Sequence, residues 1–128
     1  VNRGAGMGGF PLVSGDNAHG IDLALAHLIE LGHRRVVHAA GPTNFSTTRS
    51  RAEAFEAAAT KAGVEHDTSY AAGLTIEAGG DVADEILAGG GGCPTALVAG
   101  NDLVALGLIR RLRAEGLRCP EDVSVVGF

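Results

Sequence analysis

A run of glycines near the start of the sequence has the spacing of a phosphate-binding turn. Residues 4–9 read GAGMGG, the G-x-G-x-x-G pattern of dinucleotide-binding proteins. That chemistry needs a strand leading into the turn and a helix behind it, whose N-terminus holds the pyrophosphate. Only three residues precede the glycines, and the apolar segment 10–13 contains Pro11, which favours extended chain. We therefore interpret residues 4–9 as a loop and expect no dinucleotide cofactor.

Three other sets of residues could carry chemistry, and none has the required spacing. The five histidines form no i, i+4 pair with an acidic or thiolate partner nearby, as a metal site would need, and Cys93 and Cys119 form no C-x-x-C pair. Ser14, Asp16 and His19 could make a hydrolytic set, but the sequence lacks the G-x-S-x-G turn that presents such a serine. We expect no metal, no cofactor and no catalytic residues.

The remaining polar candidates follow short apolar stretches. Arg51 comes shortly after residues 34–41, and Asn101 and Asp102 come directly after residues 95–100. A guanidinium is a fixed fork of donors that can orient a polar ligand. Each residue also has an ordinary explanation, because an arginine can be a solvated charge and Asn or Asp can cap a helix. Lesser candidates near the same stretches, or near the next strand, are Arg49, Ser46 and Leu74.

Hydrophobic periodicity predicts the elements that must position these residues. Helical spacing of apolar residues follows a cap at Asp16 or Asn17, and Ser50 with Glu53 matches a capping box. The expected helices run from residue 16 to 31, from a cap within 46–50 to about 62, from 75 to 88 and from 102 to 115, and the expected strands cover 34–41, 68–72, 95–100 and 122–128. Such alternation predicts an α/β fold with a doubly wound parallel sheet, whose ligands bind at the carboxyl ends of the strands.

Composition limits the class of protein. Ten basic residues against fifteen acidic ones give a net charge of -5, which argues against this chain gripping a nucleic-acid backbone by itself. No apolar run approaches the roughly 20 residues of a membrane span, so we expect no membrane contact. The two cysteines fit a reduced, cytoplasmic setting. Because the chain starts at Val1 and stops at the end of a strand, we expect it to be a piece of a larger protein.

Several stretches together resemble one protein family. The segments HLIELGHRRV (27–36), GPTNFSTTRSRAEAF (41–55), PTALVAGNDLVALG (94–107) and CPEDVSVVGF (119–128) occur in the same order and at similar spacing in the lactose-repressor and galactose-repressor (LacI/GalR) family of bacterial transcription regulators. The resemblance implies a periplasmic-binding-protein-like core of two subdomains, with a small effector between them. Residues 1–15 would be the end of the first subdomain and the crossover, residues 16–128 most of the second, and the DNA-binding headpiece would be absent.

The resemblance also implies roles for individual residues. Arg51 aligns with the arginine that holds effector hydroxyls or a carboxylate, Asn101 with an effector-contacting asparagine beside Asp102, and Asp16 with the subdomain crossover. Leu74 stands where relatives often carry an aromatic that stacks on a sugar. The implied partners are a small effector, such as a sugar or a purine, and operator DNA through the missing headpiece. We expect Arg51→Ala to abolish ligand binding with little loss of stability.

A wide apolar face on the helix from residue 102 suits burial in the sheet or a subunit interface, so we expect a homodimer, as in relatives. Two other functions stay open. A sugar-binding protein of a transport system shares the architecture, and a signal peptide instead of a helix-turn-helix upstream would identify it. A nucleotide-dependent enzyme would bind NAD or ATP in a titration.

Overall fold

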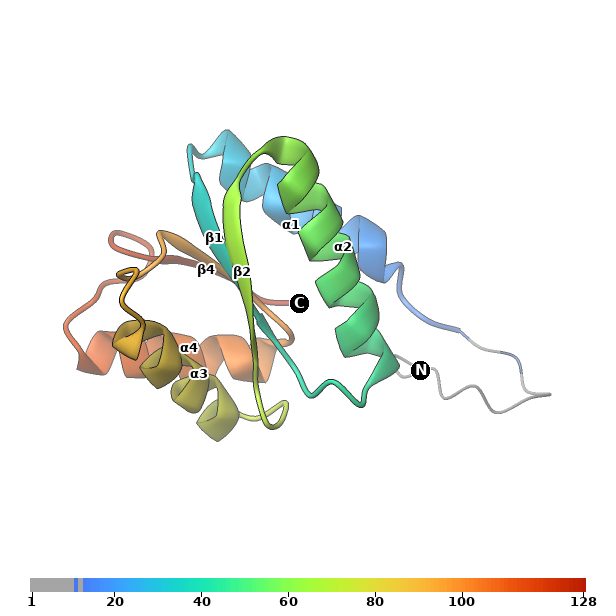
Figure 1. The fold of residues 1–128 in the computed structure, drawn as a ribbon. Helices are drawn as coiled ribbons and strands as arrows, with labels where there is room; N and C mark the ends of the chain where they lie inside the picture. Colours follow the sequence, from blue (N-terminus) through green and yellow to red (C-terminus); the bar gives the residue numbers. More distant parts are fainter. Residues whose placement is uncertain (1–10, 12) are drawn as a thin grey trace.

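The chain folds as alternating helices and strands, as its periodicity predicts (Figure 1). The computed structural model describes Pro11 and residues 13–128, so the glycine run 4–9 and most of the predicted crossover segment 1–15 lie outside the described residues. In chain order the elements are α1 (Asn17–Glu30), β1 (Arg35–Ala40), α2 (Ser46–Ala62), β2 (Glu65–Tyr70), α3 (Ile76–Ala88), β3 (Ala96–Ala99), α4 (Asp102–Ala114) and β4 (Ser124–Val126).

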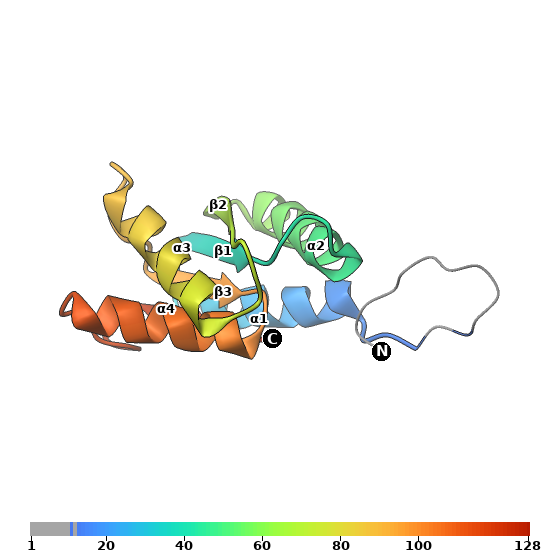
Figure 2. The ribbon, with the colours of Figure 1, turned by 90° about the horizontal axis from the view of Figure 1, so that it is seen from below.

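The described strands form one parallel sheet in the order β2-β1-β3-β4, with helices on both faces. In Figures 1 and 2, α1 and α2 cover one face, and α3 and α4 cover the other. Strand side chains alternate between the two layers, so Val36 and Val98 pack with α1 and α2, while Val37 and Leu97 pack with α3 and α4. This is the expected doubly wound α/β architecture, and it brings the carboxyl ends of β1 and β3 together.

Some element boundaries differ from those expected from the sequence. The second helix begins at Ser46, at the early end of the expected range, with Phe45 as its N-cap, so the capping box expected at Ser50 is wrong. The second strand begins at Glu65, before the expected residue 68. It pairs with β1 along its whole length, and this tertiary pairing overrides its weak apolar pattern. The last strand covers only Ser124–Val126 of the expected 122–128.

Helices α3 and α4 approach each other through two buried glycines. A Cβ on Gly107 would lie 2.0 Å from the carbonyl oxygen of Ile76, and a Cβ on Gly79 would lie 2.3 Å from the carbonyl oxygen of Val104. Glycine is therefore required at both positions, because the atoms in the way belong to the backbone of the neighbouring helix. The sequence shows Gly79 only as a weak helix former.

His33 ties the amino ends of three strands. Its backbone N–H donates to the carbonyl of Leu28 at 3.1 Å and closes the end of α1. The His33 ring is within hydrogen-bond distance of two other strands: Nδ1 lies 2.8 Å from the Thr95 hydroxyl, and Nε2 lies 3.1 Å from the Ser124 hydroxyl. The side chain thus joins the start of β1 to the starts of β3 and β4.

We expect His33→Ala to lower the free energy of unfolding by about 1–2 kcal/mol, since each of the two lost hydrogen bonds contributes about 1 kcal/mol. Urea-induced unfolding measures this change. His27→Ala is the matched control, because His27 is exposed on α1 and its loss should change stability by less than about 0.5 kcal/mol. Equal stability of the two variants would contradict the structural role of the His33 ring.

No helix in the described part of the chain has the length and apolar character needed to cross a membrane.

Candidate functional site

A small cavity lies at the carboxyl ends of β1 and β3. Its volume is about 120 Å³. Strand β1 leads into Gly41 and strand β3 into Gly100, and both glycines form part of its wall. A Cβ on Gly41 would lie 2.6 Å from the Leu74 side chain and 2.9 Å from the Thr48 side chain, so a larger residue there would displace these two lining side chains. The lining residues are His38, Gly41, Thr47, Thr48, Arg51, Leu74, Gly100, Asn101 and Phe128.

Arg51 reaches this cavity from α2 and is held by three other parts of the chain. It is only 8% exposed. Its Nε donates to the Asn17 side-chain oxygen at 2.9 Å, and its Nη1 donates to the Gly100 carbonyl at 2.6 Å. The guanidinium carbon lies 3.7 Å from the centre of the Phe128 ring, within cation–π range. Burial lowers the pKa of Arg51, yet a guanidinium stays charged in proteins.

These contacts fix the orientation of the guanidinium and use only some of its N–H donors. An arginine has five N–H donors, and the two hydrogen bonds above use one on Nε and one on Nη1. The Nη2 protons have no partner within the described part of the chain and remain for an acceptor in the cavity. The burial also changes one expectation: Arg51→Ala would remove contacts to α1, to the β3–α4 turn and to the chain end, so it should cost stability.

Asn101 lines the same cavity as Arg51, and both the oxygen and the nitrogen of its side-chain amide form hydrogen bonds. Its oxygen accepts from the Val104 N–H at 2.8 Å and caps α4, while its Nδ2 donates to the Leu74 carbonyl at 3.3 Å. The amide therefore holds the start of α4 against the loop before α3. The sequence treats capping and cavity lining as alternatives, and the structure shows both.

The other predicted residues lie around the cavity in different ways. Leu74 is part of the lining. Arg49 is exposed and donates to the Thr43 carbonyl at 3.0 Å, outside the lining. Ser46 and Asp102 each occupy the first turn of a helix and are also outside it. Asp16 is exposed and caps α1 by accepting from the His19 N–H at 3.0 Å, at the end of the predicted crossover segment.

Several side chains of this site are not among the candidates that the sequence suggests. Thr48, Phe128 and His38 line the cavity, and Asn17 holds Arg51 from α1. His38 is fully buried in β1, where its Nδ1 lies 2.9 Å from the Val98 carbonyl and its ring packs on Phe55. The available signal was a histidine within the apolar stretch VVHAA, since a polar group inside a buried strand needs a partner.

Burial lowers the pKa of His38; the Val98 hydrogen bond opposes this effect, and the nearby Arg51 charge adds to it. The unfolded chain then binds a proton at pH values where the folded chain does not. We expect the free energy of unfolding to fall as pH decreases from about 6.5 to the lower folded-state pKa. Urea unfolding at a series of pH values measures this slope, and the slope should flatten in His38→Phe. An unchanged slope would assign the pH dependence to other groups.

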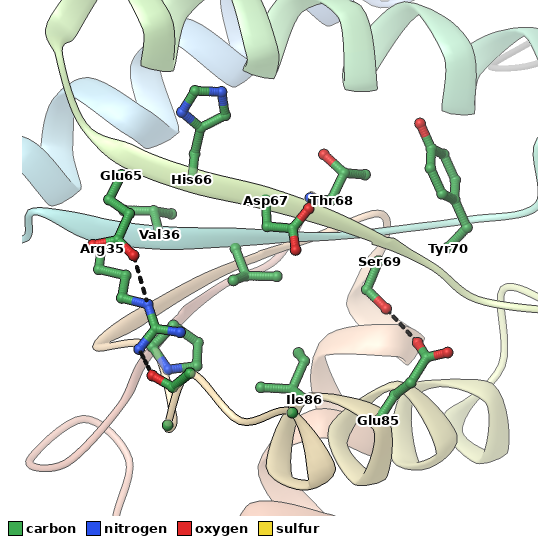
Figure 3. Close-up of a pocket in the computed structure, with 15 residues that line it drawn as sticks. Arg35, Val36, Glu65, His66, Asp67, Thr68, Ser69, Tyr70, Glu85 and Ile86 are labelled. Atoms are coloured by element: carbon green, nitrogen blue, oxygen red, sulfur yellow. Dashed lines mark hydrogen bonds and ion pairs between the residues drawn. The ribbon is translucent and has the colours of Figure 1, made fainter.

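A larger hollow of about 710 Å³ lies between β2 and α3, away from the predicted residues (Figure 3). Three of its charged groups, Arg35, Glu65 and Glu85, already have partners. Arg35 Nε lies 3.5 Å from the Glu65 carboxylate and Nη1 donates to the Gly91 carbonyl, while the Ser69 hydroxyl donates to Glu85 at 2.5 Å. Figure 3 shows both pairs along the strand.

Comparison with known proteins agrees with this architecture. Residues 25–128 match the family of periplasmic binding protein-like domains. An uncharacterised HTH-type transcriptional regulator from Streptomyces limosus is 40% identical over 123 residues, which cover 92% of this chain and 34% of that protein. This chain thus spans about a third of that relative's length.

Solved structures give the same result. A LacI transcriptional regulator from a Rhodococcus species matches with a TM-score of 0.91 and 35% identity, over 98% of this chain and 47% of that one. The lac repressor dimer bound to operator and the anti-inducer ONPF matches with a TM-score of 0.82 and 29% identity, over 88% of this chain and 39% of that one. The chain therefore belongs to the family of periplasmic-binding-protein-like domains, and the proteins it resembles there are LacI-family transcriptional regulators.

Proposed function

We propose that this chain is the ligand-sensing and dimerisation core of a LacI-type bacterial transcription regulator. The observation that carries the proposal is the small cavity where the carboxyl ends of β1 and β3 meet, with the buried Arg51 and the capping Asn101 in its wall. In doubly wound sheets this edge is where ligands bind. The kinship with transcription regulators supports sensing rather than catalysis.

The effector would act through two subdomains. We propose that residues 16–128 form most of one subdomain, that residues 1–15 end the other, and that the cavity is one wall of the cleft between them. A ligand that contacts both walls stabilises the closed orientation by its difference in affinity for the two orientations. The change of orientation alters the affinity of a separate helix-turn-helix domain for operator DNA. The coupling is reciprocal, so operator DNA changes the affinity for the effector by the same factor.

Within the cavity, Arg51 is the proposed direct ligand contact, because its Nη2 donors are unspent and its position is fixed. Asn101 and Leu74 border the ligand, with Asn101 mainly holding the wall in place. Arg49, Ser46 and Asp102 are proposed only for the outer rim, where a larger effector would extend beyond the cavity. The site as described suits a small polar compound such as a sugar.

A thermal-shift screen of the full-length protein against sugars, nucleosides and purines tests this proposal. A true effector at a hundredfold excess over Kd should raise stability by about 2.7 kcal/mol. The same compound must change operator affinity, measured by fluorescence anisotropy on labelled DNA. Absence of any shift across the three classes, or a shift with unchanged operator binding, would count against a sensing role.

We also propose a homodimer that uses α4. Leu103 and Leu106 are 46% and 53% exposed on this helix, while Leu108 and Leu112 of the same helix are fully buried in the core. We expect Leu106→Glu to weaken dimerisation about tenfold or more, because it places a charge in an apolar contact. Sedimentation equilibrium measures the dimer constant. Leu23→Glu on α1, also exposed at 58%, is the matched control and should leave the constant unchanged.

A sugar-binding protein of a transport system remains the second candidate, supported by the shared architecture. A signal peptide upstream of this chain and an unchanged operator affinity would favour it.

A further inference from the structure

Strand β2 forms an edge of the sheet. It pairs with β1 on one side, and no other strand in the described part of the chain pairs with it. Its other side therefore presents backbone N–H and C=O groups that have no ladder partner. Such an edge is a template for pairing with a strand of another molecule. Glu65, Asp67 and Tyr70 are exposed along β2, so the strand is accessible from solvent.

The hydrogen bonds to β1 show which backbone groups of β2 face outward. The N–H groups of Glu65 and Ala71 donate to carbonyl groups next to the start and at the end of β1, at 3.0 and 2.8 Å. In a parallel ladder, the groups that point to one neighbour belong to alternate residues of a strand. The N–H and C=O groups of His66, Thr68 and Tyr70 therefore point away from β1, out of the edge.

Two side chains of β2 itself occupy outward groups of this edge. Asp67 Oδ1 accepts from the Thr68 N–H at 2.8 Å, near the middle of the strand (Figure 3). His66 Nδ1 lies 2.8 Å from the carbonyl oxygen of Val64. That carbonyl also faces outward, because across a trans peptide bond it points opposite to the Glu65 N–H. A strand that paired here would have to displace side chains from backbone groups that it needs.

The outward groups are spaced so that β2 could pair with a second copy of itself. In an antiparallel pair centred on Thr68, the two Thr68 residues would exchange N–H···O bonds, and each His66 would do so with a Tyr70. Asp67 would then stand opposite Ser69 of the second copy, so the two Asp67 carboxylates would not face each other. The obstacle is instead the hydrogen bond that already occupies the Thr68 N–H at the centre of the pair.

We infer that Asp67 closes the edge of β2 to a second copy of this chain by occupying the Thr68 N–H, and that β2 becomes a self-association surface when this hydrogen bond is removed. The contact would be isologous, since the same strand takes part on both sides. It does not use α4, so it would join proposed dimers into larger assemblies. The inference does not depend on the proposed sensing role, because it concerns only the edge strand.

Sedimentation velocity of the full-length Asp67→Ala variant over a range of concentrations tests the inference. Its weight-average mass should rise to about twice the parent value or more, because an isologous contact at least doubles the assembly. Asp67→Asn retains an acceptor oxygen for the Thr68 N–H and should keep the parent mass. A parent mass in Asp67→Ala, or equal association of Asp67→Asn, would overturn the inference.

Glu65→Ala is the matched control for charge. It removes a carboxylate from the same strand but frees no outward N–H, and its ion pair with Arg35 is an exposed one of little energetic weight. This variant should keep the parent mass. If it associated as strongly as Asp67→Ala, loss of negative charge rather than of the hydrogen bond would be the cause, and the inference would be wrong.

Thr68→Pro in the Asp67→Ala background decides whether the association uses this edge. Proline has no N–H and is tolerated where an edge strand faces solvent, so the double variant should return to the parent mass. Persistent association would overturn the inference. If a variant does not fold, amide hydrogen exchange in the parent protein decides. After correction for intrinsic rates, the Thr68 amide should exchange about tenfold more slowly than the outward Tyr70 amide. Equal rates would show that Asp67 does not hold the Thr68 N–H.

Discussion

Gly107→Ala is expected to lower the free energy of unfolding by about 3 kcal/mol, at the upper end of the usual cost of overpacking. The new methyl carbon would lie 2.0 Å from the Ile76 carbonyl oxygen and 2.9 Å from both the Gly79 Cα and the Gly80 backbone nitrogen. None of these atoms can rotate away, so α3 and α4 must separate. That movement disrupts the packing of the buried Leu108 and Val82 between the helices and the sheet. Urea-induced unfolding measures the loss.

Gly80→Ala is the matched control. Gly80 is also helical and neighbours the contact, but a Cβ there meets nothing within 4 Å. Alanine should therefore stabilise the protein by about 0.5–1 kcal/mol, because it reduces the entropy of the unfolded chain and favours helix. If both variants had the same stability, the close approach of the two helices would not be the reason for Gly107.

Arg51→Ala is expected to lower the free energy of unfolding and to abolish the stabilisation by an effector. Loss of the side chain leaves the buried Gly100 carbonyl without its Arg51 donor and the Phe128 ring without its cation, so stability should fall by about 2–4 kcal/mol. The stabilisation by an effector, about 2.7 kcal/mol at a hundredfold excess over Kd, should also disappear. Thermal unfolding with and without the effector measures both losses in one experiment.

Arg49→Ala is the control, since Arg49 lies on the same helix but is exposed and makes its hydrogen bond to the Thr43 carbonyl. It should change stability by less than about 0.5 kcal/mol and reduce the effector response far less than Arg51→Ala, since Arg49 is proposed only for the outer rim. Arg51→Lys separates the two roles, because it keeps the charge and loses the fixed fork of donors. An effector response that survives in Arg51→Ala would remove Arg51 from the binding site.

Local sequence patterns determined the order and type of the elements. The apolar residues of α1 recur at helical spacing, and β3 reads as a continuous apolar run, which is typical of a strand covered on both faces. Alternation of such elements restricts the topology to parallel strands with helical crossovers. Arg51 and Asn101 could be placed near one another on this ground, because the strands before them end at the same edge of the sheet.

Only the tertiary structure decided which atoms are paired and which remain free. Asn17 and Arg51 are 34 positions apart, and His38 and Val98 are 60 apart, so no local pattern relates them. The sequence could show that His38 is a polar residue in a buried strand. It could not show that one ring nitrogen is bonded and the other is not, because hydrogen bonding depends on distances and directions that only the packed chain fixes. Gly107 is glycine for the same reason: the backbone that excludes a side chain there belongs to another helix.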